Sequence, residues 1–359
     1  RELRTELRER KLAVLIVVIH EGANRNLEYL SGFSGTTGVL AVSTRGAALA
    51  VDGRYHVRAK EEAVGVRVAP IPSGRREPRL AAYVRTALGT LNISPRSKVG
   101  FEGDRVSVLM AEAWRKKLRH TFIPTEHIVE RMRGVKSVEE IRIIADACRR
   151  TARAFGDIAP RIRSGMRERE VADMLEAALK SRGASAPSFE TIVASGPNSA
   201  TPHHKTGERK LRAGEPVVID FGGKFRHGYV SDMTRTVFVP GKRPDRTLLE
   251  IYTIVREANE RALRALRPGM LWREYDAVAR SYIKERGYGD YFTHGLGHSL
   301  GLDVHDPYDY QEAPIMPGTI MTDEPGIYLP GVGGVRIEDD LLVTAKGARR
   351  LTPAAPNPF

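Results

Sequence analysis

The sequence predicts an α/β domain over residues 1–130 and an α+β domain over residues 131–359. Apolar strands alternate with helices through the first third of the chain, whereas the rest follows the order helix pair, strands, helix pair, strands. Between these two patterns, Ser137-Val-Glu139-Glu140 has the form of a helix start, so we place the domain boundary near residues 127–136.

Six short apolar segments of the first domain are predicted as strands, because they are bounded by turn residues or by amphipathic stretches. They cover residues 12–19, 39–42, 47–51, 66–71, 98–101 and 121–124. The helices are expected at residues 55–63, 80–88 and 106–118.

The second domain is expected to contain four long helices in two pairs. They cover residues 137–158, 167–182, 246–266 and 271–286. The predicted strands cover residues 191–195, 216–222, 229–239, 293–300, 319–323, 327–329 and 335–343. The repeated order of helix pair and strands indicates an internal pseudo-repeat.

Composition argues for an ordinary globular protein, with 41% hydrophobic and 28% charged residues. The net charge of +13 comes from Arg residues scattered among Glu, so we expect no nucleic-acid partner. The apolar run at residues 12–19 is too short to span a bilayer, and we expect neither a signal peptide nor a membrane partner. The single cysteine, Cys148, is interpreted as a small buried hydrophobe, which fits a reducing cytoplasm.

Two pairs of acidic residues are the candidate functional residues of the second domain. Asp220 and Asp232 would face each other in a hairpin that turns around residue 226, where glycines are plentiful. Glu324 and Glu338 would do the same in a hairpin centred on Gly331. Like charges so close repel each other, so four acids facing one interior need cations.

A Gly-rich segment adds the three histidines His294, His298 and His305. Four carboxylates and an imidazole form an oxygen-rich donor set that suits Mn²⁺, Co²⁺ or Zn²⁺. Five such ligands, with carboxylates able to bridge, can hold two divalent metal ions about 3.5–4 Å apart. The sequence therefore predicts a two-metal centre.

These motifs resemble the metallopeptidase family that includes aminopeptidase P, prolidase and methionine aminopeptidase, whose catalytic domain has the "pita-bread" fold. The motifs, in this order, are Val218-Ile-Asp220-Phe-Gly, Ser231-Asp232-Met-Thr-Arg-Thr236, His294-Gly-Leu-Gly-His298, Asp323-Glu324-Pro-Gly and Val335-Arg-Ile-Glu338-Asp. Residues 26–38 and 51–55 look like the creatinase-like N-terminal domain of the proline-specific members, which methionine aminopeptidases lack.

The resemblance implies a set of metal ligands, and these are Asp220, Asp232, His298, Glu324 and Glu338. We expect Glu324 to act also as a proton shuttle, with His203 and His305 positioning the substrate carbonyl or stabilising the tetrahedral intermediate. His294 is expected to line the proline pocket, and Arg336 to orient Asp220 or Glu338, unless it makes only a structural ion pair. His204 is left open between a supporting and a structural role.

The implied activity is hydrolysis of Xaa-Pro bonds in a peptide with proline at its second position, by a cytoplasmic homodimer. Dipeptide-specific prolidases carry an Arg four residues after the histidine that matches His305, whereas this chain has Asp309, which would repel a substrate carboxylate. We therefore favour an aminopeptidase P-like enzyme slightly over an Xaa-Pro dipeptidase, although the short hairpin at Gly331 is prolidase-like. Creatinase-like hydrolases and non-catalytic peptide-binding relatives share this architecture, but the presence of all five ligand types argues against both.

Overall fold

The computed structural model describes residues 2–71, 80–307 and 313–355, and the chain divides into two compact units, Arg1–Arg133 and Gly134–Phe359. Asp309 lies outside the described residues. Each unit has its own hydrophobic cores. No described helix is both long and apolar enough to cross a bilayer.

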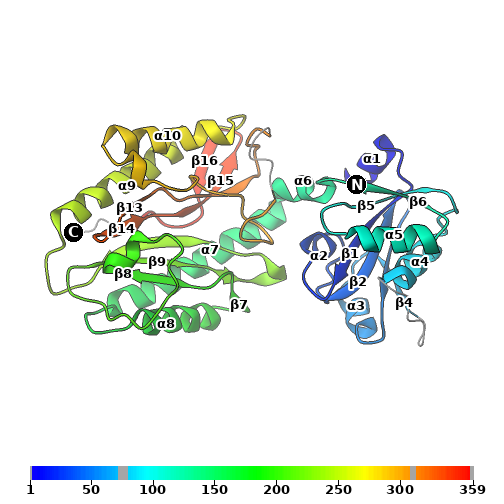
Figure 1. Ribbon diagram of the computed structural model, residues 1–359, viewed down its shortest axis with the longest axis horizontal. Coiled ribbons are helices and arrows are strands. Elements are labelled where there is room, and N and C mark those ends of the chain that lie inside the picture. The colour runs from blue at the N-terminus through cyan, green and yellow to red at the C-terminus, as the bar shows by residue number, and fades with distance from the viewer. Residues whose placement is uncertain (1, 72–79, 308–312, 356–359) are drawn as a thin grey trace. The chain divides into compact units, whose positions relative to one another are not determined.

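The first unit is built on a six-stranded mixed sheet with the order β4-β3-β2-β1-β5-β6 (Figure 1). Its strands are β1 (Val14–His20), β2 (Thr37–Ser43), β3 (Ala47–Val51), β4 (Arg67–Pro70), β5 (Lys98–Glu102) and β6 (Thr121–Thr125). Its helices are α1 (Glu2–Glu9), α2 (Arg25–Ser31), α3 (His56–Glu62), α4 (Ala81–Thr90), α5 (Val108–Lys117) and α6 (Ile128–Gly134). All six predicted strands and all three predicted helices are confirmed within a few residues at their ends.

Alternation along β1 explains why both faces of this sheet are covered by helices. Val14, Ile16 and Val18 pack with side chains of α4 and α5, whereas the intervening apolar residues pack with α1, α2 and α3. Helix α6 lies where the domain boundary was predicted, and its Arg133 is buried and donates a hydrogen bond to Asn26 at 2.8 Å.

The second unit repeats one arrangement, in which a helix pair packs on antiparallel strands; these form one sheet, β11-β9-β8, in the first half and two sheets, β12-β15-β16 and β13-β14, in the second (Figure 1). Its helices are α7 (Val138–Ile158), α8 (Glu168–Ser181), α9 (Arg246–Ala265) and α10 (Trp272–Glu285). The first pair covers the sheet β11-β9-β8, formed by β8 (Ile192–Ser195), β9 (Pro216–Phe221) and β11 (Met233–Phe238). The second pair packs on β12 (Ile320–Asp323), β13 (Gly326–Leu329), β14 (Gly333–Arg336), β15 (Asp339–Thr344) and β16 (Gly347–Arg350).

Three strand predictions in this unit were wrong in extent or kind. Residues 293–300 form no strand, because side chains and single backbone contacts replace a regular ladder; the His298 amide, for example, donates to Thr322 Oγ1 at 2.9 Å. The expected strand at 229–239 begins only at Met233. The expected strand at 335–343 is interrupted between β14 and β15, at Ile337 and Glu338.

Gly222 is a position where the fold tolerates no side chain, because an added Cβ would lie 1.9 Å from the Ser231 carbonyl oxygen. We expect Gly222→Ala to destabilise the protein by about 1–3 kcal/mol, since two backbone segments must move apart. Gly156→Ala in α7 is the matched control, because the new methyl group would meet no atom within 4 Å in the described part of the chain and alanine favours a helix. Thermal unfolding of both variants checks this, and equal melting temperatures would contradict it.

Candidate metal centre

Asp220 and Asp232 come from neighbouring segments of one sheet but do not face each other directly. Thr234, and not Asp232, pairs with Asp220 in the ladder between β9 and β11. The chain turns at Arg226–Gly228, within one residue of the predicted position, but the expected pairing of Asp220 with Asp232 is wrong, and the connection also contains the short strand β10 (Gly223–Lys224). The register differs by two residues, which keeps Asp232 on the expected face of the sheet.

The second pair of acids confirms the predicted centre of its hairpin. Gly326 pairs with Arg336, and Asp323 pairs with Asp339, so both flanking ladders turn around Gly331. Glu324 and Glu338 therefore lie across from each other between two ladders. The break in regular pairing at these positions frees both side chains from the alternation of the sheet.

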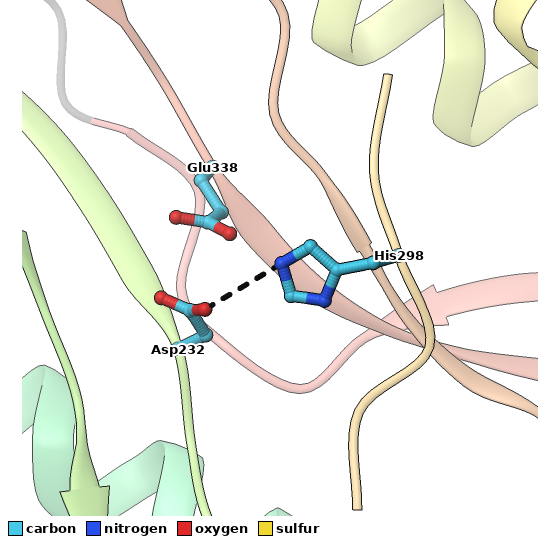
Figure 2. A group of neighbouring side chains, drawn as sticks. All are labelled: Asp232, His298 and Glu338. Atoms are coloured by element: carbon cyan, nitrogen blue, oxygen red, sulfur yellow. Dashed lines mark ion pairs between the residues drawn. The ribbon is translucent and has the colours of Figure 1, made fainter. Parts of the chain in front are cut away.

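His298 meets these acids from the Gly-rich segment. Ligand atoms of Asp232, His298 and Glu338 all lie within 4.8 Å of one another (Figure 2). His298 Nε2 is 3.8 Å from Asp232 Oδ2 and 3.4 Å from Glu324 Oε1. Its Nδ1 faces the Ser299 carbonyl at 3.2 Å, so a proton on Nδ1 leaves the Nε2 lone pair directed at the acids.

The electrostatics of this group are unfavourable without a positive charge. Burial raises the pKa of Asp232 well above its usual range, and the carboxylate of Glu338 raises it further. Burial likewise raises the pKa of Glu338, with Glu324 adding to the shift, and raises the pKa of Glu324 to about 8. Burial lowers the pKa of His298 to about 4, so its imidazole is neutral at physiological pH.

The residues present fit a divalent cation. Asp220 Oδ1 and Asp232 Oδ1 are buried and accept no hydrogen bond from any residue that the structure describes. Buried oxygens without donors are rare because leaving them unpaired costs free energy. Carboxylate oxygens and a neutral imidazole are ligands that Mn²⁺, Co²⁺ and Zn²⁺ accept, so a metal ion would satisfy these atoms.

Arg336 holds two of the acids in place through hydrogen bonds. Its buried guanidinium donates to Asp220 Oδ2 at 2.7 Å, to the Tyr328 hydroxyl at 2.9 Å and to Thr234 Oγ1 at 3.1 Å. Thr234 in turn donates to Glu338 Oε2 at 2.7 Å. One arginine thus orients Asp220 directly and Glu338 through a threonine hydroxyl.

Two of the remaining predicted histidines contact the candidate ligands. His305 is exposed and stacks on His298, with ring centroids 4.0 Å apart. His294 bonds the Tyr328 hydroxyl at 2.8 Å and lies 4.0 Å from Glu324 Oε2. Both imidazoles therefore border the group of acids, as the sequence predicted.

The neighbouring histidines His203 and His204, which follow Pro202, occupy two different environments. His203 is exposed. Burial lowers the pKa of His294 to about 4 and lowers that of His305, and the charge of His203 adds to both shifts. His204 instead pairs with Glu168 at 2.9 Å, which gives it a structural contact.

Sequence reasoning missed three residues that support the site. Thr234 and Tyr328 both accept hydrogen bonds from Arg336. The sequence offered one indication for Thr234, which lies two residues after Asp232 and so on the same face of the predicted strand. Asp340 accepts the Asp232 backbone amide at 3.2 Å and lies 3.1 Å from the thiol of Cys148, which is buried as predicted. An acid two positions after Glu338 in the predicted strand was the available signal for Asp340.

Comparisons with known proteins agree with this picture. Residues 142–345 match the model of metallopeptidase family M24, and residues 1–135 match the creatinase/prolidase N-terminal domain. An Xaa-Pro dipeptidase from Pyrococcus furiosus is 44% identical over 258 residues, 71% of this chain and 73% of that protein.

Two solved structures resemble the chain over nearly its whole length. An Xaa-Pro dipeptidase from Bacillus anthracis is 36% identical with a TM-score of 0.88, covering 99% of this chain and 96% of the other. An X-Pro aminopeptidase from Thermotoga maritima is 34% identical with a TM-score of 0.87, covering 98% and 97%. The two-domain fold expected from the sequence is confirmed.

Metal binding should release protons in a pH-dependent way. With a pKa of about 8, Glu324 of the metal-free protein is protonated at pH 6.5 and must ionise to bind a cation. Calorimetric titration with Mn²⁺ in buffers of different ionisation enthalpy should show proton release at pH 6.5 that falls by pH 9. Equal release at both pH values would contradict the assignment.

The raised pKa of Glu324 also determines how the free energy of unfolding of the metal-free protein varies with pH. Glu324 binds its proton more tightly in the folded than in the unfolded state, where its pKa is 4.5. Its contribution to metal-free stability is therefore complete below about pH 4.5 and is lost as the pH rises through about 8.

Proposed function

Because the chain belongs to metallopeptidase family M24, we propose that it hydrolyses the peptide bond that precedes a proline, with Xaa-Pro dipeptides as its preferred substrates. The convergence of His298, Asp232 and Glu338, with Glu324 beside them, carries this proposal, since it is a buried donor set for divalent ions. The named dipeptidase relatives support the substrate class.

We propose that two divalent ions, of Mn²⁺, Co²⁺ or Zn²⁺, are held by the five predicted ligands. When bound, such a pair supplies the Lewis acidity that makes water reactive near neutral pH. Asp220 and Asp232 each present an oxygen that accepts no hydrogen bond within the described ranges, 2–71, 80–307 and 313–355. Glu324, Glu338 and His298 complete the set.

Glu324 has the geometry of a proton carrier. The bond before proline is a tertiary amide, so its nitrogen must be protonated before it can leave. Glu324 Oε1 lies near Thr322 Oγ1 (3.2 Å) and His298 Nε2 (3.4 Å), while its other oxygen faces His294. We propose that Glu324 takes the proton from the attacking water and delivers it to the proline nitrogen.

Three histidines would contact the substrate in this proposal. His203 and His305 are exposed imidazoles that would hold the scissile carbonyl and stabilise the charge that develops on its oxygen. His294 would line the proline pocket, because its ring packs edge-on against Phe292 with centroids 5.1 Å apart, forming an apolar wall.

Arg336 acts on the ligands in this proposal and not on the substrate. All three of its guanidinium nitrogens bond protein groups, including Asp220 and Tyr328, and the residue is only 3% exposed. The arginine therefore fixes the direction of the Asp220 carboxylate and, through Thr234, that of Glu338.

The sequence and the relatives point to different substrate lengths. The sequence favoured an aminopeptidase because of Asp309, which lies outside the described residues. Two of the three named relatives are Xaa-Pro dipeptidases and one is an X-Pro aminopeptidase, and the short hairpin between β13 and β14, which turns through Gly331, agrees with the dipeptidases. We therefore propose the dipeptidase as the main activity.

A panel of peptides with the metal-replete protein tests this choice. We expect kcat/KM for an Xaa-Pro dipeptide to exceed that for the matching Xaa-Pro-Yaa tripeptide by about 10-fold or more. The Xaa-Ala dipeptide serves as the control for proline specificity. Faster cleavage of the tripeptide would establish the aminopeptidase, and no cleavage of any proline peptide would refute the proposed function.

Removing one ligand should abolish metal binding without unfolding the protein. In Asp232→Asn and Glu338→Gln the side chains keep their size but lose the charge that holds a cation, so we expect activity to fall at least about 100-fold. Metal content by mass spectrometry and circular dichroism check the result. Asp173→Asn, an exposed change on α8, is the control. Full turnover in either ligand variant would overturn the assignment.

A further inference from the structure

Lys136 forms a buried ion pair that the proposed reaction does not use. Its Nζ lies 3.2 Å from Asp306 Oδ2, and both side chains are only 1% exposed. The same ammonium donates to Ser299 Oγ at 3.2 Å and to the Gly134 carbonyl at 3.3 Å. A buried pair often contributes little net stability compared with apolar residues, so its presence calls for another explanation.

Asp306 closes the turn that follows His298. Its backbone amide donates to the Ser299 carbonyl at 2.8 Å, and its Oδ1 accepts the Asp303 amide at 3.2 Å. A Cβ on Gly301 would lie 2.6 Å from Asp306 Oδ2, so the turn wraps closely around this carboxylate. Lys136 therefore bonds both ends of residues 299–306, which we call the histidine turn.

The histidine turn directly follows one residue of the candidate site, His298, and contains another, His305. His298 precedes Ser299, His305 precedes Asp306, and the two imidazoles stack with centroids 4.0 Å apart. The hydroxyl of Ser299 also lies 3.4 Å from the Ile320 carbonyl of β12, and the Lys136 amide donates to the Gly318 carbonyl at 2.9 Å. One lysine thus joins the start of the second unit to the turn behind both histidines.

We propose that Lys136 is a positioning residue, whose contacts with Asp306 and Ser299 hold the histidine turn so that His298 and His305 keep their stacked arrangement. These contacts reach the candidate site through the turn, so the lysine would act on the two imidazoles indirectly. This inference rests on the proposed function only where it concerns catalysis, since the order of the turn can be measured without substrate.

The experiment separates positioning from mere stability by using two variants. Lys136→Met removes the ammonium group from beside the buried Asp306 carboxylate, and we expect its melting temperature to fall by roughly 10 °C. Lys136→Met/Asp306→Asn removes both charges and keeps an oxygen for the Asp303 amide, so its melting temperature should recover most of that loss. Lys346→Met, at an exposed lysine, is the control for removal of a positive charge.

In the double variant, kcat on Xaa-Pro should stay about 10- to 100-fold below wild type while KM changes little, because the reacting groups are misplaced. Hydrogen exchange of the metal-free protein should become faster in residues 299–306 and remain unchanged in α9. Recovery of kcat together with the melting temperature would overturn the proposal, as would unchanged exchange in the histidine turn.

If the double variant stays unstable, hydrogen exchange measured below its melting temperature decides the question. Faster exchange confined to the histidine turn supports the proposal, and uniformly faster exchange throughout the second unit overturns it. Wild-type protein that is inactive on every proline peptide would refute the proposed function and leave the exchange result to judge this inference separately.

Discussion

Repulsion among buried carboxylates is the constraint on which this catalytic unit depends. Asp220, Asp232, Glu324 and Glu338 are brought together by two hairpins, in surroundings where ionised acids are poorly solvated. Such a group must either bind protons or be compensated by cations. The protein supplies part of this charge itself, and the arrangement of those groups determines where a metal ion can enter.

Hydrogen-bond donors of the protein contact only some of the carboxylate oxygens of these acids. Arg336 bonds one oxygen of Asp220, and Thr234 bonds one oxygen of Glu338, whereas Asp220 Oδ1 and Asp232 Oδ1 have no donor in the described chain. In Asp220, one oxygen is therefore held by the arginine while the other has no donor in the described chain. The hydrogen bonds of Arg336 and Thr234 set the directions of the Asp220 and Glu338 carboxylates without a metal ion, as a preorganised site requires.

How much of the site could be predicted depended on how each hairpin turns. The pair Glu324 and Glu338 was placed correctly because the chain around Gly331 turns symmetrically. The pair Asp220 and Asp232 was misplaced by two residues, since the connection between β9 and β11 contains a short strand and a 3₁₀ turn that glycine content alone does not reveal. Asp232 still lies beside His298 and Glu338, because a shift of two residues preserves the face of a strand.

Residues that contact the candidate ligands were harder to predict than the candidates themselves. His298 stands in a conspicuous Gly-rich motif, but its segment is an irregular stretch bonded to β12 and not the strand that its apolar residues suggested. Lys136 and Asp306 are separated by most of the second unit in sequence, and an isolated lysine before a helix cap resembles any solvated charge. Their pairing becomes visible only when the fold buries both, because burial converts an ordinary charge into one that must have a specific partner.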